Sequence, residues 1–210
     1  MKVYILAATM LEIEPLIESP LIHDCKLIIT GVGSVPTTFH LSKLISEDRP
    51  ELVIQAGVAG SFDAALDLGT VVIVNQDRIA DLGVEENNQW KDLVDLGLAK
   101  GNDDPYTNGW LTNEHPQLNK FGLPLVKGVT INEVTTNPVR VKMLKAKYEP
   151  SIESMEGAAL HFVCLMEGIP FLQLRSVSNY VGERDKSKWE MKLAVKNLNE
   201  ALANLIQELA

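Results

Sequence analysis

The 210-residue sequence has few cysteines and no excess of positive charge. Its two cysteines, Cys25 and Cys164, do not have the spacing of metal ligands, and we expect two free core thiols rather than a disulfide. Lys and Arg number 19 against 28 Asp and Glu, which gives a formal net charge of −9. This balance argues against non-specific binding to nucleic acid, because such binding neutralises phosphates with Lys and Arg.

Long apolar runs are absent as well, since none approaches the roughly 20 residues of a transmembrane helix. Residues 1–16 carry one Lys and two carboxylates and lack a small-residue cleavage site, so we expect no secretory signal and a cytoplasmic protein that does not bind membranes. The composition, 46% hydrophobic and 22% charged, is typical of a soluble globular protein. The length suits a single domain, residues 1–210, with a buried sheet.

Apolar, β-rich runs alternate with helical stretches along the chain. Several runs are continuously apolar, which favours strands buried on both faces of a largely parallel sheet. We expect strands at residues 2–8, 26–30, 52–56, 70–75, 125–131 and 171–178, and helices at residues 36–46, 155–167 and 188–210. The alternation predicts a layered α/β domain.

Residues 80–123 differ from the rest of the chain, because they are polar, rich in Asn, Asp and Gly, and contain Trp90, Tyr106 and Trp110. A loop of this length within a compact domain is usually an active-site lid or a disordered excursion. The aromatic residues favour a surface that faces a ligand or a partner.

In an open α/β sheet the ligand binds beyond the carboxyl ends of the strands, so the segments after each strand are examined first. Glu12 follows the first strand and has capping-box spacing from Thr9. Pro15 instead favours a helix that starts near Glu14, since proline prefers the first helical turn. Glu12 would then lie in the loop before the helix, where its carboxylate could face a cleft.

The second and third strands are followed by small-residue segments, Thr-Gly-Val-Gly-Ser around Gly31 and Ala-Gly-Val-Ala-Gly-Ser around Gly57. Turns of this kind let backbone amides approach a ligand closely. Neither segment has the spacing of a dinucleotide-binding loop or a P-loop, which argues against a dinucleotide or a nucleoside triphosphate as ligand.

Two polar residues at later element ends have both a structural and a functional interpretation. Glu156 opens a helix, where a carboxylate stabilises the helix dipole by about 0.3–1 kcal/mol. Asn179 follows the last predicted strand and is a common turn residue. Taken singly, each is more typical of structure than of a site.

Taken in chain order, these segments resemble the purine-nucleoside phosphorylase and nucleosidase family over nearly the whole chain. The match consists of the Glu after strand one, TGVGS, AGVAGSF, SMEGAAL and RSVSNY. The resemblance implies a three-layer α/β sandwich around a mixed, largely parallel sheet. It also implies a homodimer whose neighbour helps to close the pocket, and a reaction that uses no metal and no cofactor.

The resemblance also assigns roles to individual residues. It implies that Glu12 orients or deprotonates the nucleophile, that Met155 and Glu156 grip the ribose, and that Asn179 handles the purine. Further substrate contacts are expected from Gly31, Gly57, Val58, Ala59, Ile131 and Ser178.

The nucleophile is expected to be water rather than phosphate. Phosphate binding requires cations or paired arginines. The phosphorylases of the family place an Arg near the first strand end and another before the glycine segment after strand three, whereas here the first loop has no Arg and Gln55 stands at the second position. This pattern favours the nucleosidase branch.

Asn179 also bears on the purine base. In the nucleosidases that cleave adenine from methylthioadenosine and S-adenosylhomocysteine, an Asp occupies the position that matches Asn179. An amide can donate to O6 and accept from N7–H of a 6-oxopurine, which favours hypoxanthine or guanine. An adenine-releasing nucleosidase and a non-catalytic nucleoside-binding protein remain the alternatives, although a binding protein has no need of the Glu12 carboxylate.

The segments SMEGAAL and SNYVGERDKSKW further resemble a branch whose 6-oxopurine nucleoside carries a bulky aromatic carboxylate at the ribose 5′ end. Residues 80–123 and 180–189, the latter with Arg184, Lys186 and Lys188, are expected to form the pocket for that group. Solvated charges on a loop are the simpler interpretation of these three cations. The segment around Val134 lacks the aromatic residue that often covers the base, so its replacement should come from elsewhere, such as residues 80–123.

Overall fold

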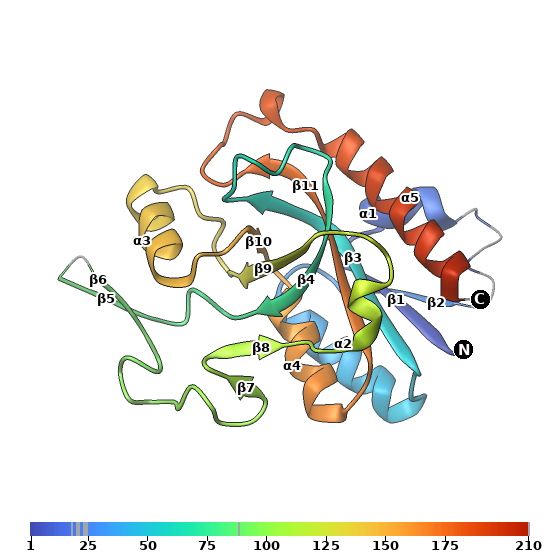
Figure 1. Cartoon of the computed structure of the whole chain (residues 1–210), viewed down its shortest axis with the longest axis horizontal. Coiled ribbons are helices and arrows are strands. Elements are labelled where there is room, and N and C mark those ends of the chain that lie inside the picture. Colours follow the sequence, from blue (N-terminus) through green and yellow to red (C-terminus); the bar gives the residue numbers. More distant parts are fainter. Residues whose placement is uncertain (18, 20–21, 23–24, 88, 210) are drawn as a thin grey trace.

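A central sheet organises the part of the chain that the computed structural model describes, residues 1–17, 19, 22, 25–87 and 89–209 (Figure 1). Within these residues the sheet has nine strands in the order β2-β1-β3-β10-β9-β4-β8-β7, with β11 paired to both β3 and β4. The pairs β1–β2, β1–β3, β3–β11, β4–β9 and β9–β10 are parallel, and the pairs β3–β10, β4–β11, β4–β8 and β7–β8 are antiparallel. The predicted mixed, largely parallel sheet is confirmed.

The long strands agree closely with the predicted runs. The strands of the central sheet are β1 (Val3–Ala7), β2 (Cys25–Ile29), β3 (Leu52–Ser61), β4 (Val71–Asp77), β7 (Tyr106–Thr107), β8 (Trp110–Thr112), β9 (Leu125–Thr130), β10 (Ile152–Ser154) and β11 (Phe171–Tyr180). A separate hairpin consists of β5 (Gly83–Glu86) and β6 (Gln89–Asp92). The helices are α1 (Met10–Ile17), α2 (Ser34–Glu47), α3 (Pro138–Tyr148), α4 (Gly157–Glu167) and α5 (Met191–Leu209), with short 3-10 turns η2 (Pro116–Asn119) and η3 (Lys186–Lys188).

The layers follow from the two-residue period of strand side chains. In β1, Ile5 packs in the cluster that contains Leu198 of α5, whereas Leu6 packs on the opposite face with Leu41 of α2 and Leu160 of α4. Helices α1 and α5 therefore cover one face of the sheet, and α2 and α4 cover the other (Figure 1). This burial on both faces explains the continuously apolar strands.

Two strand boundaries differ from the predictions in ways that matter for the site. The segment predicted as a turn around Gly57 is part of β3, and Asn179 lies inside β11 rather than after it. These strands pair in parallel up to Tyr180, with a bulge between Val177 and Asn179. The bulge changes the direction of side chains in β11 without ending the strand. The small residues around Gly57 therefore belong to a paired strand, β3, and not to a loop.

Helix α1 starts at Met10, so the prediction that Glu12 lies in a loop before the helix is wrong. Pro15 lies inside this helix instead of opening it. The burial of Ile13 and Leu16 against the sheet offsets the backbone hydrogen bond that proline cannot make. Helix α4 starts at Gly157, one residue after Glu156, and α5 starts at Met191 rather than at residue 188. Ala210, the predicted end of the last helix, lies outside the described residues.

The described part of residues 80–123 is not an unstructured excursion. It contains the β5–β6 hairpin and the strands β7 and β8, and β8 extends the central sheet beside β4 (Figure 1). Trp90 donates its indole N–H to the Tyr148 hydroxyl at 2.9 Å, and Trp110 meets the ring of Tyr148 edge-on. Trp90 and Trp110 therefore pack against the core around Tyr148, whereas Tyr106 lines a separate small cavity.

Cys25 and Cys164 are free thiols, as predicted. Cys164 is fully buried in the core between α2 and α4, and burial raises the pKa of its thiol. Among the described residues, no helix is both long enough and apolar enough to cross a membrane.

Candidate functional site

A cavity of about 220 Å³ lies beside the carboxyl ends of β1 and β10 and the carboxyl-terminal halves of β3 and β11. It is lined by Ala8, Thr9, Glu12, Val32, Val58, Ala59, Gly60, Ile131, Val134, Glu153, Ser154, Met155, Glu156, Ser178, Asn179, Trp189 and Met191. Segments from both ends of the chain thus meet in one place, at the end of the sheet where α/β proteins bind ligands. Every residue predicted to act in catalysis or to contact the ribose and the purine lines this cavity, except Gly31 and Gly57, and the predicted cations Arg184, Lys186 and Lys188 do not line it.

Gly57 and Gly31 are not part of this lining, and their predicted contact with the ligand stays a prediction. A Cβ on Gly57 would lie 2.3 Å from Nη1 of Arg175 and 2.9 Å from Oε1 of Glu12. Glycine is required there because a charged group from each side converges on the space that its missing side chain leaves. Gly31 has a φ of +86° and donates its N–H to the Ala8 carbonyl at 3.1 Å, which fixes the turn after β2.

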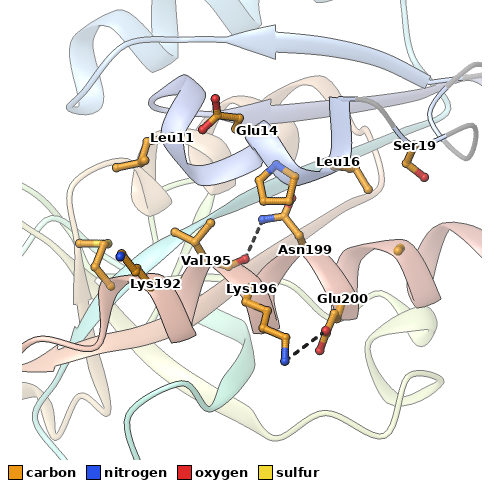
Figure 2. A pocket seen from close by; sticks show the side chains of 12 residues that line it. Leu11, Glu14, Leu16, Ser19, Lys192, Val195, Lys196, Asn199 and Glu200 are labelled. Carbon is orange, nitrogen blue, oxygen red and sulfur yellow. Dashed lines mark hydrogen bonds and ion pairs between the residues drawn. The ribbon is translucent and has the colours of Figure 1, made fainter.

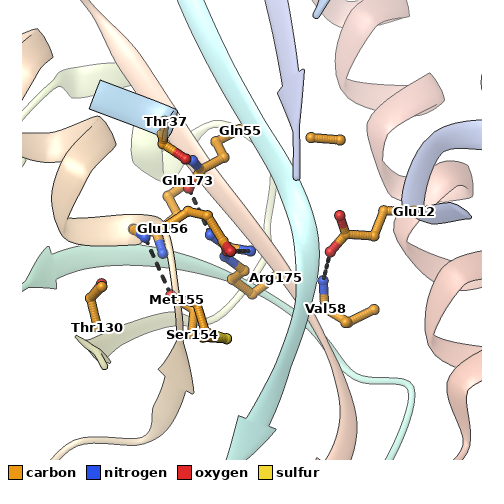
Figure 3. Close-up of polar contacts among 12 residues, drawn as sticks. Glu12, Thr37, Gln55, Val58, Thr130, Ser154, Met155, Glu156, Gln173 and Arg175 are labelled. Carbon is orange, nitrogen blue, oxygen red and sulfur yellow. Dashed lines mark hydrogen bonds and ion pairs between the residues drawn. The ribbon is translucent and has the colours of Figure 1, made fainter. Parts of the chain in front are cut away.

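The Glu12 carboxylate is held at both of its oxygens. Oε2 accepts the N–H of Thr9 at 3.0 Å, which is half of a capping box, and Oε1 accepts the N–H of Val58 at 3.1 Å (Figure 3). Glu12 is only 7% exposed. Glu12 therefore both caps the helix through Thr9 and lines the cavity. Both are possible because the first turn of α1 lies close to the end of β1.

Glu156 is the N-cap residue of α4, but its side chain makes no capping hydrogen bond. Its Oε1 instead accepts the N–H of Gly33 at 3.0 Å, and its Oε2 lies 3.4 Å from Nη1 of Arg175 (Figure 3). Nη2 of Arg175 also donates to Oε1 of Gln55 at 2.7 Å. A role as a helix-dipole carboxylate alone does not account for these contacts.

Arg175 is the residue that sequence reasoning missed. It lies within β11 and is 1% exposed, which makes it one of the largest fully buried side chains described. The available signal was a single charged residue inside a strand that contains no other charge. A buried charge must be paired, so such a residue should always prompt a search for its partner.

The Asn179 amide has a defined orientation. Its Nδ2 donates to the Tyr180 carbonyl at 3.1 Å, and its Oδ1 accepts from the Ser178 hydroxyl at 2.9 Å. Because a carbonyl can only accept, the amide nitrogen must be the atom that faces Tyr180. One N–H and one oxygen lone pair of the amide remain available to a ligand in the cavity.

A buried polar network supports the start of α4 beneath Glu156. Thr130 donates its hydroxyl to Oδ1 of Asp77 at 2.8 Å and accepts the N–H of Ala158 at 2.7 Å. Gln173 donates to Oδ2 of Asp77 at 3.1 Å. A Cβ on Gly157 would lie 2.1 Å from both Asp77 and Gln173, so only glycine fits after Glu156. Burial raises the pKa of Asp77 to about 6, against the effect of these hydrogen bonds.

Residues 180–189 reach the cavity, but residues 80–123 contribute none of its lining among the described residues. Within one chain the latter segment therefore does not line the cavity, and its expected part in the pocket stays a prediction. Trp189 lines the cavity, and the guanidinium of Arg184 lies 5.7 Å from the centre of its ring. Lys188 pairs with Glu183 at 2.7 Å on the surface. Trp189 is the only aromatic side chain among the described residues that line the cavity.

A second groove, of about 460 Å³, lies between α1 and α5 (Figure 2). Glu14 lines this groove and not the cavity that holds Glu12. Lys196 and Glu200 form an exposed pair at 3.6 Å, and Asn199 donates to the carbonyls of Val195 and Glu12. The groove is larger than the cavity but lacks its convergent buried carboxylates, so we take the cavity as the candidate site.

No group of three or more His, Cys, Asp or Glu side chains in the described ranges is placed to hold a metal ion. The cavity instead offers two buried carboxylates, a fixed amide and backbone N–H groups. Carboxylates held in this way can bind hydroxyl groups or take a proton, and the amide can pair with a heterocycle that has a donor beside an acceptor.

Comparison with known proteins supports the predicted family. A family model described as the phosphorylase superfamily matches residues 23–210. Futalosine hydrolase of Thermus thermophilus is 33% identical over 187 residues, which cover 85% of this chain and 80% of that protein. A 5′-methylthioadenosine/S-adenosylhomocysteine nucleosidase of Marinomonas sp. is 29% identical over 196 residues, with coverages of 89% and 80%. The native structure of Helicobacter pylori futalosine hydrolase has the same fold, with a TM-score of 0.80, 21% identity and coverages of 99% and 98%.

Proposed function

The chain belongs to the phosphorylase superfamily, and we propose that it is a purine nucleosidase that hydrolyses the N-glycosidic bond of futalosine. The products are hypoxanthine and dehypoxanthine futalosine, and the family resemblance implies a role in menaquinone biosynthesis. The main support is that Glu12, Glu156 and the amide of Asn179 line one cavity. The alternative is release of adenine, as in a methylthioadenosine/S-adenosylhomocysteine or aminofutalosine nucleosidase.

Water is the proposed nucleophile, because no Lys or Arg is among the described residues that line the cavity, and phosphate would need such cations. Arg175 is buried behind the cavity, but its guanidinium already contacts Glu156 and Gln55. A phosphate dianion needs charge-assisted hydrogen bonds to such forks, and an uncompensated dianion beside Glu12 would be costly. The contacts of Arg175 therefore favour hydrolysis over phosphorolysis.

In the proposed reaction, the glycosidic bond stretches first and positive charge develops on the ribose. Glu156 binds the 2′- and 3′-hydroxyls, and its charge favours the developing cation. Met155 and the backbone around Val58 and Ala59 pack against the sugar. Glu12 aligns a water molecule and takes its proton, a general-base contribution of roughly 10²–10⁴-fold.

The departing base is proposed to bind Asn179. The free N–H of the amide donates to O6 of hypoxanthine, and the free lone pair of Oδ1 accepts from the N7–H that forms as the base leaves. Ser178 keeps the amide in this orientation, and Ile131 and Trp189 are the apolar surfaces proposed to contact the base and the 5′ substituent. Arg184 beside Trp189 is the proposed partner of the aromatic carboxylate.

The proposal treats residues 1–210 as one nucleosidase domain that forms a homodimer in the cytoplasm. The family resemblance supports this assembly, in which a neighbouring subunit closes the pocket. Sedimentation equilibrium of the purified chain tests the homodimer directly, and a monomer at micromolar concentration contradicts it.

The function is tested by incubating the protein with futalosine, aminofutalosine and methylthioadenosine, with and without phosphate, and by identifying the released base chromatographically. We expect hypoxanthine from futalosine at a rate that added phosphate does not change. Release of adenine in preference to hypoxanthine supports the alternative. A saturable requirement for phosphate, or formation of a ribose 1-phosphate, overturns the hydrolase.

A further inference from the structure

Glu153 is a buried carboxylate in the cavity that the proposed mechanism does not use. It lies in β10, is 6% exposed and lines the cavity. Its Oε1 accepts the N–H of Thr135 at 3.1 Å. Its Oε2 is buried and has no hydrogen-bond partner among the described residues. Burial raises the pKa of Glu153, whereas Thr135 and the charge of Arg140 lower it. An unpaired carboxylate oxygen in a ligand cavity lacks one proton donor.

The position of Glu153 relative to Asn179 indicates which donor is missing. Both residues are paired in register with Gly60 of β3, Glu153 from β10 and Asn179 from β11. Residues paired in register direct their side chains to the same face of a sheet. The two polar side chains therefore flank a glycine, on strands whose Cα atoms are about 10 Å apart. A Cβ on Gly60 would lie 3.3 Å from Nδ2 of Asn179, so the amide of Asn179 lies over Gly60, and both Asn179 and Glu153 line the same cavity.

A 6-oxopurine presents N7, O6 and N1–H in this order around its edge. When N7 and O6 face Asn179, the N1–H is the next group and points away from the N7 side, toward β10. We propose that Oε2 of Glu153 accepts the N1–H of the purine and that Glu153 and Asn179 together select a 6-oxopurine. This inference rests on the proposed function, and it adds a second residue that determines the base.

The chemistry discriminates because adenine has the opposite pattern at this position. N1 of adenine carries no hydrogen and is an acceptor, so it would meet an acceptor oxygen of the carboxylate. A site that pairs with a donor on the correct ligand rejects an analogue that lacks the donor, since its own buried group is then left unpaired. Glu153 would thus exclude adenine independently of Asn179.

A purely structural role for Glu153 makes a different prediction. The Thr135 hydroxyl is also buried and without a hydrogen-bond partner among the described residues. If a rotation of this hydroxyl satisfies Oε2, then Glu153 only anchors the segment that contains Thr135. Loss of an anchor should reduce activity on every nucleoside by a similar factor, whereas loss of a base contact changes the preference between bases.

The test compares wild type with Glu153→Gln, and Glu133→Gln serves as a matched control because Glu133 is exposed and does not line the cavity. Gln can still accept from Thr135 N–H, but it presents an N–H₂ donor in place of Oε2. The values of kcat/KM are measured for futalosine and for aminofutalosine. We expect Glu153→Gln to lower the futalosine-to-aminofutalosine ratio by about tenfold or more, and the control to leave it unchanged.

Binding of free hypoxanthine and free adenine, measured by calorimetry, provides a readout that needs no turnover. If the wild type releases no base from either nucleoside, the proposed function fails, but a preference for hypoxanthine that Glu153→Gln removes still supports the inference. Equal losses for both bases, or a wild-type preference for adenine, overturn it. If circular dichroism shows that the Gln variant is unfolded, Glu153→Leu replaces it, with the same expected loss of preference.

Discussion

The guanidinium of Arg175 and the carboxylate of Glu156 form a buried ion pair, with Nη1 3.4 Å from Oε2 and side chains that are 1% and 7% exposed. Arg175 comes from the interior of β11, and Glu156 immediately precedes α4. The pair directs a carboxylate into the cavity that would otherwise lie at an ordinary helix start. Oε1 of Glu156 accepts the N–H of Gly33, so the ion pair connects the segments that contain Gly33, Glu156 and Arg175.

Replacement of Arg175 should destabilise the whole protein. Arg175→Met leaves the Glu156 charge buried without its partner, so we expect the free energy of unfolding to fall by about 3–5 kcal/mol. Urea denaturation measures this change. The double variant Arg175→Met/Glu156→Gln should recover part of the loss, because no unpaired charge remains. If the single and the double variant have the same free energy of unfolding, then Arg175 does not stabilise the charge of Glu156.

Replacement of Glu12 should affect the chemistry more than binding. Glu12→Gln removes the proposed base, and we expect kcat to fall by roughly 10²–10⁴-fold while KM changes little. Glu14→Gln is the control, since Glu14 is exposed and lines the separate groove between α1 and α5. Steady-state kinetics on futalosine distinguish the two variants. If both lose activity equally, the assignment of the base to Glu12 is wrong.

Replacement of Asn179 should change the preferred base. In Asn179→Asp an acceptor oxygen replaces the N–H that faces O6, and the lost contact should cost on the order of 1–3 kcal/mol with futalosine. The same carboxyl group can accept from the N6 amino group of adenine. We therefore expect the ratio of kcat/KM for aminofutalosine to that for futalosine to rise. An unchanged ratio in a folded variant means that Asn179 does not contact the base.

His161 should make the stability of the protein fall in acid. Its Nδ1 lies 2.9 Å from the Leu111 carbonyl, and burial lowers its pKa from 6.5 to about 4. A pKa that is lower in the folded state gives stability that is present above pH 6.5 and is lost as the pH falls toward 4. The loss from this residue should be about 3 kcal/mol.

The control for this prediction is His161→Asn, which keeps an N–H donor near the Leu111 carbonyl but does not titrate. Urea denaturation measures the unfolding free energy of both proteins from pH 7 to pH 4. As the pH falls, the wild type should lose more unfolding free energy than the variant. Asp77, with its pKa raised to about 6, has the opposite pH dependence, but it is present in both proteins. A difference that is constant with pH contradicts the prediction.

The order of the long strands and the main site segments could be read from the sequence, because both depend on local patterns. Runs such as those around Ile5 and Ile54 are apolar on both faces, which indicates a covered sheet wherever the strands finally pair. Glu12, Glu156 and Asn179 could be selected because they follow or end such runs and match the motifs of a family. The helix boundaries near Pro15 were less accessible, since tertiary burial of Ile13 and Leu16 outweighs the local preference of proline.

Only the tertiary structure decided which groups meet. Gly57 is needed because Arg175 and Glu12 approach it from other segments, and Gly60 separates Glu153 from Asn179 because β3 lies between β10 and β11. Short strands such as β10 carry too few residues for a detectable period, and their register depends on pairing with distant neighbours. A buried charge in a strand shows from sequence that a partner must exist, but the partner itself is fixed by long-range packing.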